Sequence, residues 1–241
     1  MRREGQVRTE RQMSQSSALQ LLVTSSLSKS YGDLVALEAL DITIPPGQRV
    51  ALVGRNGSGK STLLKVATGL LEPSTGSVTI AGHPSGSIEA RATLSYLPDE
   101  PVLYDDLSVI EHIEYTCRLH ASTDWEERAV GLLDRLGLLA RAEALPSTFS
   151  RGLRQKTAAV LSLVRPFSLL LVDEPFVGLD PSGREAFVEL TDEASLSGAA
   201  VVVATHQLDY AKSANRCIVL RDGAVVYDGP PGAVDLVPLV E

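Results

Sequence analysis

Residues 49–71 are RVALVGRNGSGKSTLLKVATGLL, an apolar run, a glycine-rich segment and a helical run in that order. Val50–Val53 is typical of a buried strand, and residues 63–71 are typical of a helix. The glycines between them let backbone N–H groups converge on phosphate oxygens, and a helix N-terminus adds partial positive charge. The stretch therefore predicts a strand, a phosphate-binding loop and a helix.

The loop supplies side chains for the phosphates and for a metal ion. Lys60 is expected to reach the outer phosphates, and the Ser61 hydroxyl to bind Mg²⁺. Chance produces this pattern in a chain of 241 residues only on the order of once in a hundred, so an incidental Gly/Ser turn is disfavoured. The candidate nucleotide ligands are Gly54, Arg55, Asn56, Gly57, Ser58, Gly59, Lys60, Ser61 and Thr62.

Two carboxylates follow a second apolar run, Leu169–Val172. Ligands bind at the carboxyl edge of open α/β sheets, where Asp173 and Glu174 would lie. Asp173 is expected to hold Mg²⁺, directly or through water, and Glu174 to accept a proton from the attacking water. Acidic residues also end strands simply because loops are wet, but the phosphate loop upstream favours the functional interpretation.

The rest of the chain indicates a sheet covered by helices, because short β-branched runs alternate with helical patterns. RVALVG, LLLVDE and AVVVAT are nearly continuously apolar, as in parallel strands buried on both faces. Residues 98–165 are mostly helical, and Ser108 with Glu111 and Thr123 with Glu126 both fit a capping box. We call residues 98–165 the helical insert of a nucleotide-binding α/β core.

The overall composition limits which binding partners and which cellular compartment we expect. A net charge of -8 disfavours a nucleic-acid partner, since phosphate neutralisation needs an excess of Lys and Arg. Cys117 and Cys217 form no CxxC pair, which favours a reducing compartment and two buried apolar positions. Residues 1–18 are polar and predict a flexible tail, and no apolar stretch is long enough for a membrane span. We expect a cytoplasmic protein.

At this point residues 19–229 resemble the ATP-binding subunits of ABC transporters. FSRGLRQK at residues 149–156 is similar to the LSGGQ signature of that family, and closer still to the YSKGM forms of the bacterial exporter (ABC-2 type) subfamily. The strict signature has Gly and Gln where this chain has Arg151 and Leu153. The resemblance implies that Ser150 and Gly152 present a hydroxyl and an N–H to a γ-phosphate bound by the opposite subunit.

Three further residues match the family. Tyr31 stands where an aromatic ring stacks on adenine, although a strand-edge tyrosine is its simpler interpretation. Asp180, in GLDP at residues 178–181, resembles the aspartate that crosses to the partner subunit, and it also fits a helix N-cap followed by Pro181. His206 resembles the histidine that contacts the γ-phosphate; a strand-end histidine without a task is the alternative.

One position departs from the family. In YLPDEPVLYDDLSV, residues 96–109, Asp99 replaces the glutamine that normally contacts the metal and water and links the core to the helical insert. An aspartate can still ligate Mg²⁺, so Asp99 stays a candidate metal ligand. It adds negative charge near the phosphates, however, and when ionised it cannot donate a hydrogen bond.

The resemblance implies a P-loop NTPase (RecA-like) α/β core with an antiparallel β part and the helical insert, all within residues 19–241. Two such subunits would pair head to tail around ATP, with Lys60, Glu174 and His206 as catalytic residues. Integral membrane permease subunits would hold them at the cytoplasmic face of the membrane, and the signature favours export. Two alternatives remain open: a soluble ABC-type ATPase in translation, repair or cofactor assembly, and a non-catalytic regulatory subunit.

Overall fold

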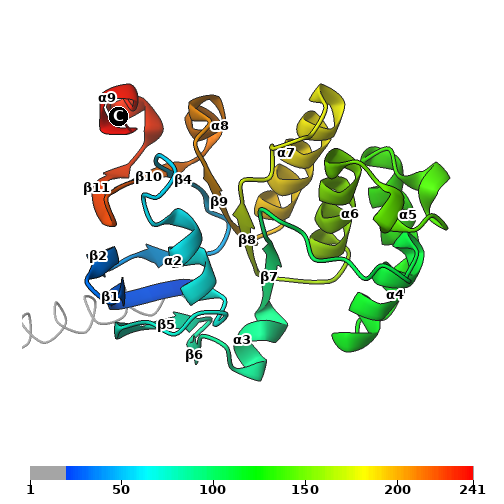
Figure 1. Ribbon diagram of the computed structural model, residues 1–241, viewed down its shortest axis with the longest axis horizontal. Helices are drawn as coiled ribbons and strands as arrows, with labels where there is room; N and C mark the ends of the chain where they lie inside the picture. Colours follow the sequence, from blue (N-terminus) through cyan, green and yellow to red (C-terminus); the bar gives the residue numbers. More distant parts are fainter. Residues whose placement is uncertain (1–19, 241) are drawn as a thin grey trace, which may run out of the picture.

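The computed structural model describes residues 20–240, and one six-stranded sheet forms its centre (Figure 1). The strand order is β11-β10-β4-β9-β8-β7, parallel throughout except for the antiparallel β10–β11 pair. The three predicted parallel strands are adjacent and buried, which confirms that prediction. The strands are β4 (Arg49–Val53), β7 (Leu94–Leu97), β8 (Leu169–Asp173), β9 (Ala200–Thr205), β10 (Arg216–Arg221) and β11 (Ala224–Gly229).

A second sheet is antiparallel in every strand pair, in the order β2-β1-β5-β6 with β3 paired to β1. Its strands are β1 (Leu22–Tyr31), β2 (Leu34–Leu40), β3 (Thr43–Ile44), β5 (Thr75–Ile80) and β6 (His83–Pro84). Helix α2 (Lys60–Ala67) lies between the two sheets and contacts β8 on one side and β5 on the other (Figure 1). One apolar core therefore fixes the phosphate loop, which leads into α2, against both sheets.

The other face of the central sheet is covered by helices, among them α6, α7 and α8. Between β7 and β8 the chain forms a separate lobe, the right-hand part of Figure 1, from α4, α5 and α6. The helices are α3 (Ile88–Thr93), α4 (Val109–Leu119), α5 (Glu126–Arg135), α6 (Arg151–Leu163), α7 (Pro181–Leu196), α8 (Leu208–Ser213) and α9 (Val237–Val240), with 3₁₀ turns at Leu139–Arg141, Pro146–Thr148 and Pro231–Ala233.

The starts of these helices test the capping predictions. Ser108 and Glu111 form the expected reciprocal capping box at α4, and Asp180 caps α7 ahead of Pro181. The second capping box is wrong: α5 begins at Glu126 with Trp125 as its N-cap and no side-chain cap. Asp124 has a φ of 55°, and this left-handed residue turns the chain between Thr123 and the helix, so Thr123 is not the N-cap.

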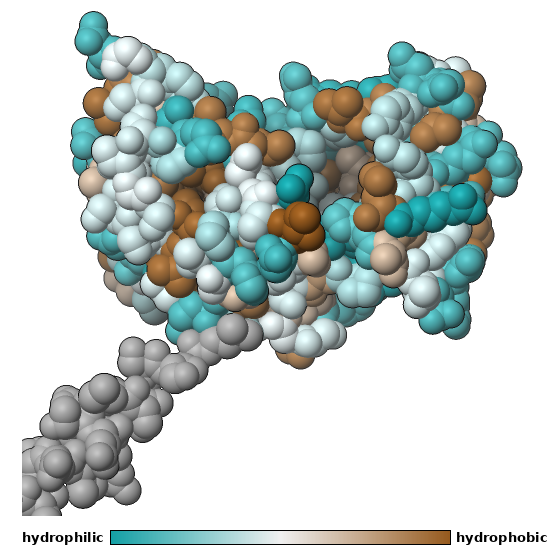
Figure 2. All heavy atoms as spheres, turned by 90° about the horizontal axis from the view of Figure 1, so that it is seen from below, coloured by the Kyte–Doolittle hydropathy of each residue, from teal (hydrophilic) through white to brown (hydrophobic). Residues whose placement is uncertain are grey.

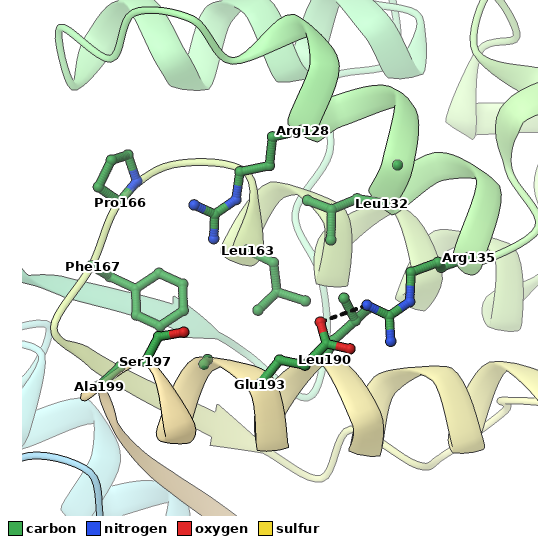
Figure 3. Close-up of a pocket in the computed structure, with 12 residues that line it drawn as sticks. Arg128, Leu132, Arg135, Leu163, Pro166, Phe167, Leu190, Glu193, Ser197 and Ala199 are labelled. Carbon is green, nitrogen blue, oxygen red and sulfur yellow. Dashed lines mark hydrogen bonds and ion pairs between the residues drawn. The ribbon is translucent and has the colours of Figure 1, made fainter.

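Helix α5 meets α7 across a cavity of about 490 Å³ (Figure 3). Arg135 of α5 bridges it, with nitrogen–oxygen distances of 3.1 Å to Glu189 and 2.7 Å to Glu193 of α7. Arg128, also of α5, and Phe167, in the loop before β8, point into the same space. The helical insert is thus tied to α7 here by charges around a cavity rather than by continuous packing.

Other expectations concern the cysteines, the termini and membrane spans. Cys117 and Cys217 are buried and free, as expected for core positions. The predicted tail, residues 1–18, lies outside the described residues. Within residues 20–240 no helix has the length and apolar character that crossing a bilayer requires.

The pairing of β1 with β5 yields a test of this fold. Ser26 forms a bulge in β1, and a Cβ added to Gly76 would lie 2.3 Å from the carbonyl oxygens of both Ser25 and Ser26. Gly82 has a φ of 83°, close to the 76° of Gly76, but a Cβ added to Gly82 would meet nothing within 4 Å. We expect Gly82→Ala to cost about 1–2 kcal/mol for its backbone alone and Gly76→Ala about 1–3 kcal/mol more. Urea unfolding measures the loss of stability in each variant, and equal losses would contradict the close contact at Gly76.

Candidate active site

The phosphate loop runs from the end of β4 to the first turn of α2. Gly57 and Gly59 have φ values of 84° and 102°, in the left-handed region that glycine adopts without cost. A Cβ on Gly59 would also lie 2.7 Å from the Ala36 carbonyl oxygen. The Lys60 amine is buried inside the loop and donates to the carbonyl oxygens of Gly54 at 2.8 Å and Arg55 at 3.2 Å. The loop is therefore closed around one buried positive charge.

A polar cavity of about 320 Å³ lies over this loop. It brings together most of the predicted phosphate ligands with two carboxylates from other parts of the chain, Asp99 and Glu174. Arg55 instead lines a neighbouring cavity of about 310 Å³, beside Arg221 and Val240. The residues around the first cavity are Ala36, Asn56, Gly57, Ser58, Gly59, Lys60, Ser61, Thr62, Asp99 and Glu174.

Glu174 is held in an unusual backbone conformation directly after β8. Its φ is 45°, which non-glycine residues adopt only where their surroundings impose it. Its N–H donates to the Ala204 carbonyl oxygen of β9 at 2.9 Å. Oε1 lies 3.6 Å from the Lys60 amine and Oε2 lies 3.0 Å from Nδ1 of His206. The carboxylate is therefore placed between the phosphate-loop amine and the imidazole.

Asp173 is the last residue of β8 and is 2% exposed. Burial raises the pKa of its carboxyl, the charges of Asp99 and Glu174 raise this pKa further, and a hydrogen bond from Ser61 and the charge of Lys60 oppose the rise. The folded protein thus keeps a desolvated acid next to the Ser61 hydroxyl. A bound cation would stabilise the ionised form of such a group.

Several buried oxygens around the cleft have no hydrogen-bond partner among the described residues. They are Ser58 Oγ, Asp99 Oδ1, Asp173 Oδ1 and Glu174 Oε1. Native proteins rarely leave such atoms unpaired, and these belong to carboxylates and a hydroxyl, the oxygen ligands that Mg²⁺ takes. Within residues 20–240 no three His, Cys, Asp or Glu side chains form a metal cluster of their own. The residues present therefore fit a Mg²⁺ ion held by few protein oxygens together with phosphate oxygens.

Besides Gly54, Arg55, Asp173 and His206, four predicted site residues are absent from the lining of this cavity. Tyr31, at the end of β1, is 50% exposed. Ser150 is the N-cap of α6 and accepts from the Leu153 N–H at 3.4 Å. Gly152 packs on the loop after β8, where an added Cβ would lie 2.3 Å from the Gly178 carbonyl oxygen. Asp180 caps α7.

Sequence analysis missed a partner of Asp180. Lys156 of α6 is 9% exposed, and its amine lies 2.7 Å from Asp180 Oδ1. This contact is the main cause that lowers the pKa of Asp180. The available signal was a charged residue on the face of α6 that carries Leu153 and Val160, where a buried lysine requires a partner.

Comparisons with known proteins show which family shares this fold and cleft. The family profile described as "ABC transporter" matches residues 37–177. The SkfA peptide export ATP-binding protein SkfE of Bacillus subtilis is 33% identical over 213 residues, 87% of this chain and 89% of SkfE. A solved ATP-binding subunit of an ABC transporter superposes with a TM-score of 0.85 at 32% identity, covering 91% of this chain and 97% of that one.

A second solved structure is a dimeric ATP-binding cassette in a post-hydrolysis state, bound to ADP and Pi. Its TM-score is 0.81 at 26% identity, with 88% of this chain and 99% of that chain covered. The profile spans more than half of the 241 residues, and the relatives are matched over nearly their full length. This chain belongs to the ABC transporter family, as an ATP-binding subunit that hydrolyses ATP.

Proposed function

We propose that this chain works as one half of a pair of ATPase subunits that drives a cargo outward through separate membrane subunits. The observation that carries the proposal is the position of Glu174, between Lys60 and His206 at the mouth of the phosphate-loop cavity. A carboxylate there is within reach of a water molecule beside a γ-phosphate, and hydrogen bonding from His206 orients it.

Each part of the cleft has its own task in this proposal. The backbone N–H groups of residues 54–62 and the Lys60 amine hold the phosphates, and Tyr31 offers an exposed ring to the adenine. Ser61, Asp173 and Asp99 are the candidate Mg²⁺ ligands, and the ion would supply positive charge to the phosphate oxygens. Glu174 accepts the proton of the attacking water, and His206 fixes the Glu174 carboxylate through Oε2.

The second subunit completes the site. Ser150, Gly152 and Asp180 do not line the phosphate-loop cavity of their own chain. Ser150 and Asp180 lie at the N-termini of α6 and α7, ends that favour anions. A head-to-tail partner would place its own Ser150 and Gly152 over this cavity, and the dimeric relative shows that such cassettes do pair.

A groove between the core and the helical insert is the proposed seat of the membrane partner. It has a volume of about 350 Å³ and largely apolar walls, and the loop after β7 forms one side. Two apolar side chains of its lining are largely exposed to water: Val102 is 94% exposed and Leu70 68%. The face of the molecule in Figure 2 is hollowed between its two lobes, with hydrophobic side chains at the rim. An apolar helix end of a permease fits this surface.

Export is the proposed direction. SkfE is named for peptide export, and the FSRGLRQK segment resembles the signatures of exporter subunits. Relatives named for import match at similar identity, so the signature and SkfE carry the direction and overall similarity does not.

Glu174→Gln tests the catalytic assignment. The amide cannot take the proton, so we expect the rate of ATP hydrolysis to fall about 100- to 1,000-fold while ATP binding is kept and an ATP-bound dimer accumulates. Phosphate release and size-exclusion chromatography with light scattering measure the two effects. Glu185→Gln, an exposed change on α7, is the control. Full hydrolysis by the Glu174 variant would remove this residue from the role.

Asp173→Asn tests the metal assignment through stability. Burial raises the pKa of the Asp173 carboxyl in the folded protein. Above that pKa the ionised, buried carboxylate lowers the free energy of unfolding, whereas at acid pH the carboxyl is protonated and this cost is absent. We expect the variant without nucleotide to unfold at a higher temperature than the parent at pH 7.5, and the difference to shrink toward pH 4. The extra stabilisation that Mg²⁺ adds to ATP should be lost. A variant that keeps this Mg²⁺ effect would argue against Asp173 as a ligand.

Val102→Asp tests the docking groove. A carboxylate in the centre of the apolar surface should move the chain from the membrane fraction to the supernatant of its native cells, while ATP binding by the purified variant is unchanged. Leu196→Asp is a matched control, because Leu196 is also an exposed apolar side chain, at 89%, but does not line the groove. Equal release by both variants, or by neither, would exclude this groove as the attachment site.

A further inference from the structure

Two charged residues at which this chain departs from the strict family pattern lie next to each other. Asp99 follows β7, and Arg151 is the first residue of α6, far along the chain. Their side chains are 43% and 61% exposed, and Arg151 Nη2 lies 3.6 Å from Asp99 Oδ1. At this distance the two groups form an ion pair but no hydrogen bond. In the strict family pattern the corresponding residues are an uncharged glutamine and glycine, which form no such pair, whereas the YSKGM forms carry a lysine at the position of Arg151.

Asp99 also belongs to the nucleotide cleft. It lines the phosphate-loop cavity with Lys60, Ser61 and Glu174, and its Oδ1 is buried without a hydrogen-bond partner among the described residues. Glu174 lies 3.6 Å from the Lys60 amine, and the Asp173 carboxyl is close enough to Asp99, Glu174 and Lys60 for their charges to shift its pKa. A triphosphate would therefore enter a cleft that already carries an excess of negative charge, to which the replacement of glutamine by Asp99 contributes.

The base of the Arg151 side chain packs against the loop after β8. The first turn of α6 presses on the loop after β8, where a Cβ on Gly152 would lie 2.3 Å from the Gly178 carbonyl oxygen. A Cβ on Gly178 would in turn meet Arg151 Cγ at 3.6 Å, so the aliphatic part of Arg151 lies over Gly178. From this base the exposed guanidinium reaches Asp99.

The loop that carries Asp99 is fixed at its other end by His112 of α4. The Tyr104 N–H donates to His112 Nε2 at 2.8 Å, and Nδ1 of the same ring lies 2.8 Å from the Ser108 carbonyl oxygen. The ring thus spans from the loop to the first turn of α4. Arg151 and His112 hold this connection between the core and the helical insert from its two ends.

We propose that Arg151 is a positioning residue for the chain's own ATP site, which offsets the charge of Asp99 and keeps this carboxylate at the edge of the cleft. The inference rests on the proposed function and names a further part of that site. The charges of Asp99 and Arg151 then compensate each other. Without Arg151, Asp99 repels the phosphates; without Asp99, Arg151 has no task in binding ATP to its own chain.

A double-mutant cycle tests the pair. The full chain, Asp99→Gln, Arg151→Gln and the double variant are titrated with a fluorescent ATP analogue at concentrations where light scattering shows monomers, so that a partner's site contributes nothing. We expect Arg151→Gln to weaken binding roughly 3- to 10-fold, in the range of coupled contacts. In the Asp99→Gln background the same change should alter the affinity less than about 1.5-fold, within the error of additivity.

Charge and structure are separated by two further measurements. The loss of affinity for the ATP analogue caused by Arg151→Gln should be larger without Mg²⁺ than with it. This loss should also shrink as the salt concentration rises toward 0.5 M, because the screening length then falls to roughly a few ångströms. Arg151→Lys should restore most of the affinity. Arg141→Gln removes a charge from an exposed position of the same insert and should have no effect. Thermal unfolding without nucleotide checks that every variant folds.

An equal loss of affinity in both Asp99 backgrounds, or no loss in either, would overturn the proposal. A penalty that is independent of salt would overturn it too, because it would assign Arg151 a packing role. These outcomes differ from a failure of the proposed function, in which the unchanged chain itself would not bind the analogue.

Discussion

Parallel pairing of three buried strands brings the candidate catalytic groups of this protein together. β4, β9 and β8 are adjacent, and their residues pair in register up to the last residue of each strand. The phosphate loop leaves β4, His206 follows β9, Asp173 ends β8 and Glu174 follows it. Since all three strands point the same way, these groups meet at one edge of the sheet. A shift of β8 along its neighbours would move Glu174 away from both Lys60 and His206.

The same edge carries strain and unpaired charge that a fold selected only for stability would avoid. Glu174 occupies a left-handed conformation, Asp173 is a buried acid, and several oxygens beside them lack hydrogen-bond partners among the described residues. Such features cost free energy in the protein alone and lose their cost when a cation and phosphates satisfy them. Ligand binding should therefore stabilise this chain strongly, because the cost is concentrated where the ligand binds.

Much of this was predictable because the signals are local. The phosphate loop, the apolar parallel strands, and the caps at Ser108 and Asp180 depend on residues within a few positions of each other, and the structure has them. Local signals also fail: Thr123 and Glu126 show the same spacing as Ser108 and Glu111, but left-handed Asp124 changes where α5 begins. β7 has only four residues and no clear pattern, and it is a strand because β8 pairs with it.

Contacts between distant segments were not predictable from one sequence. Asp99 and Arg151 were each recognisable as departures, but their proximity depends on how the loop after β7 meets the start of α6. Lys156 finds Asp180 in the same way, through the packing of α6 on the loop after β8. Both contacts join α6 to segments that flank the nucleotide cleft. Because α6 also carries Ser150 and Gly152, a displacement of this helix would change the chain's own cleft and the surface offered to a partner's nucleotide together.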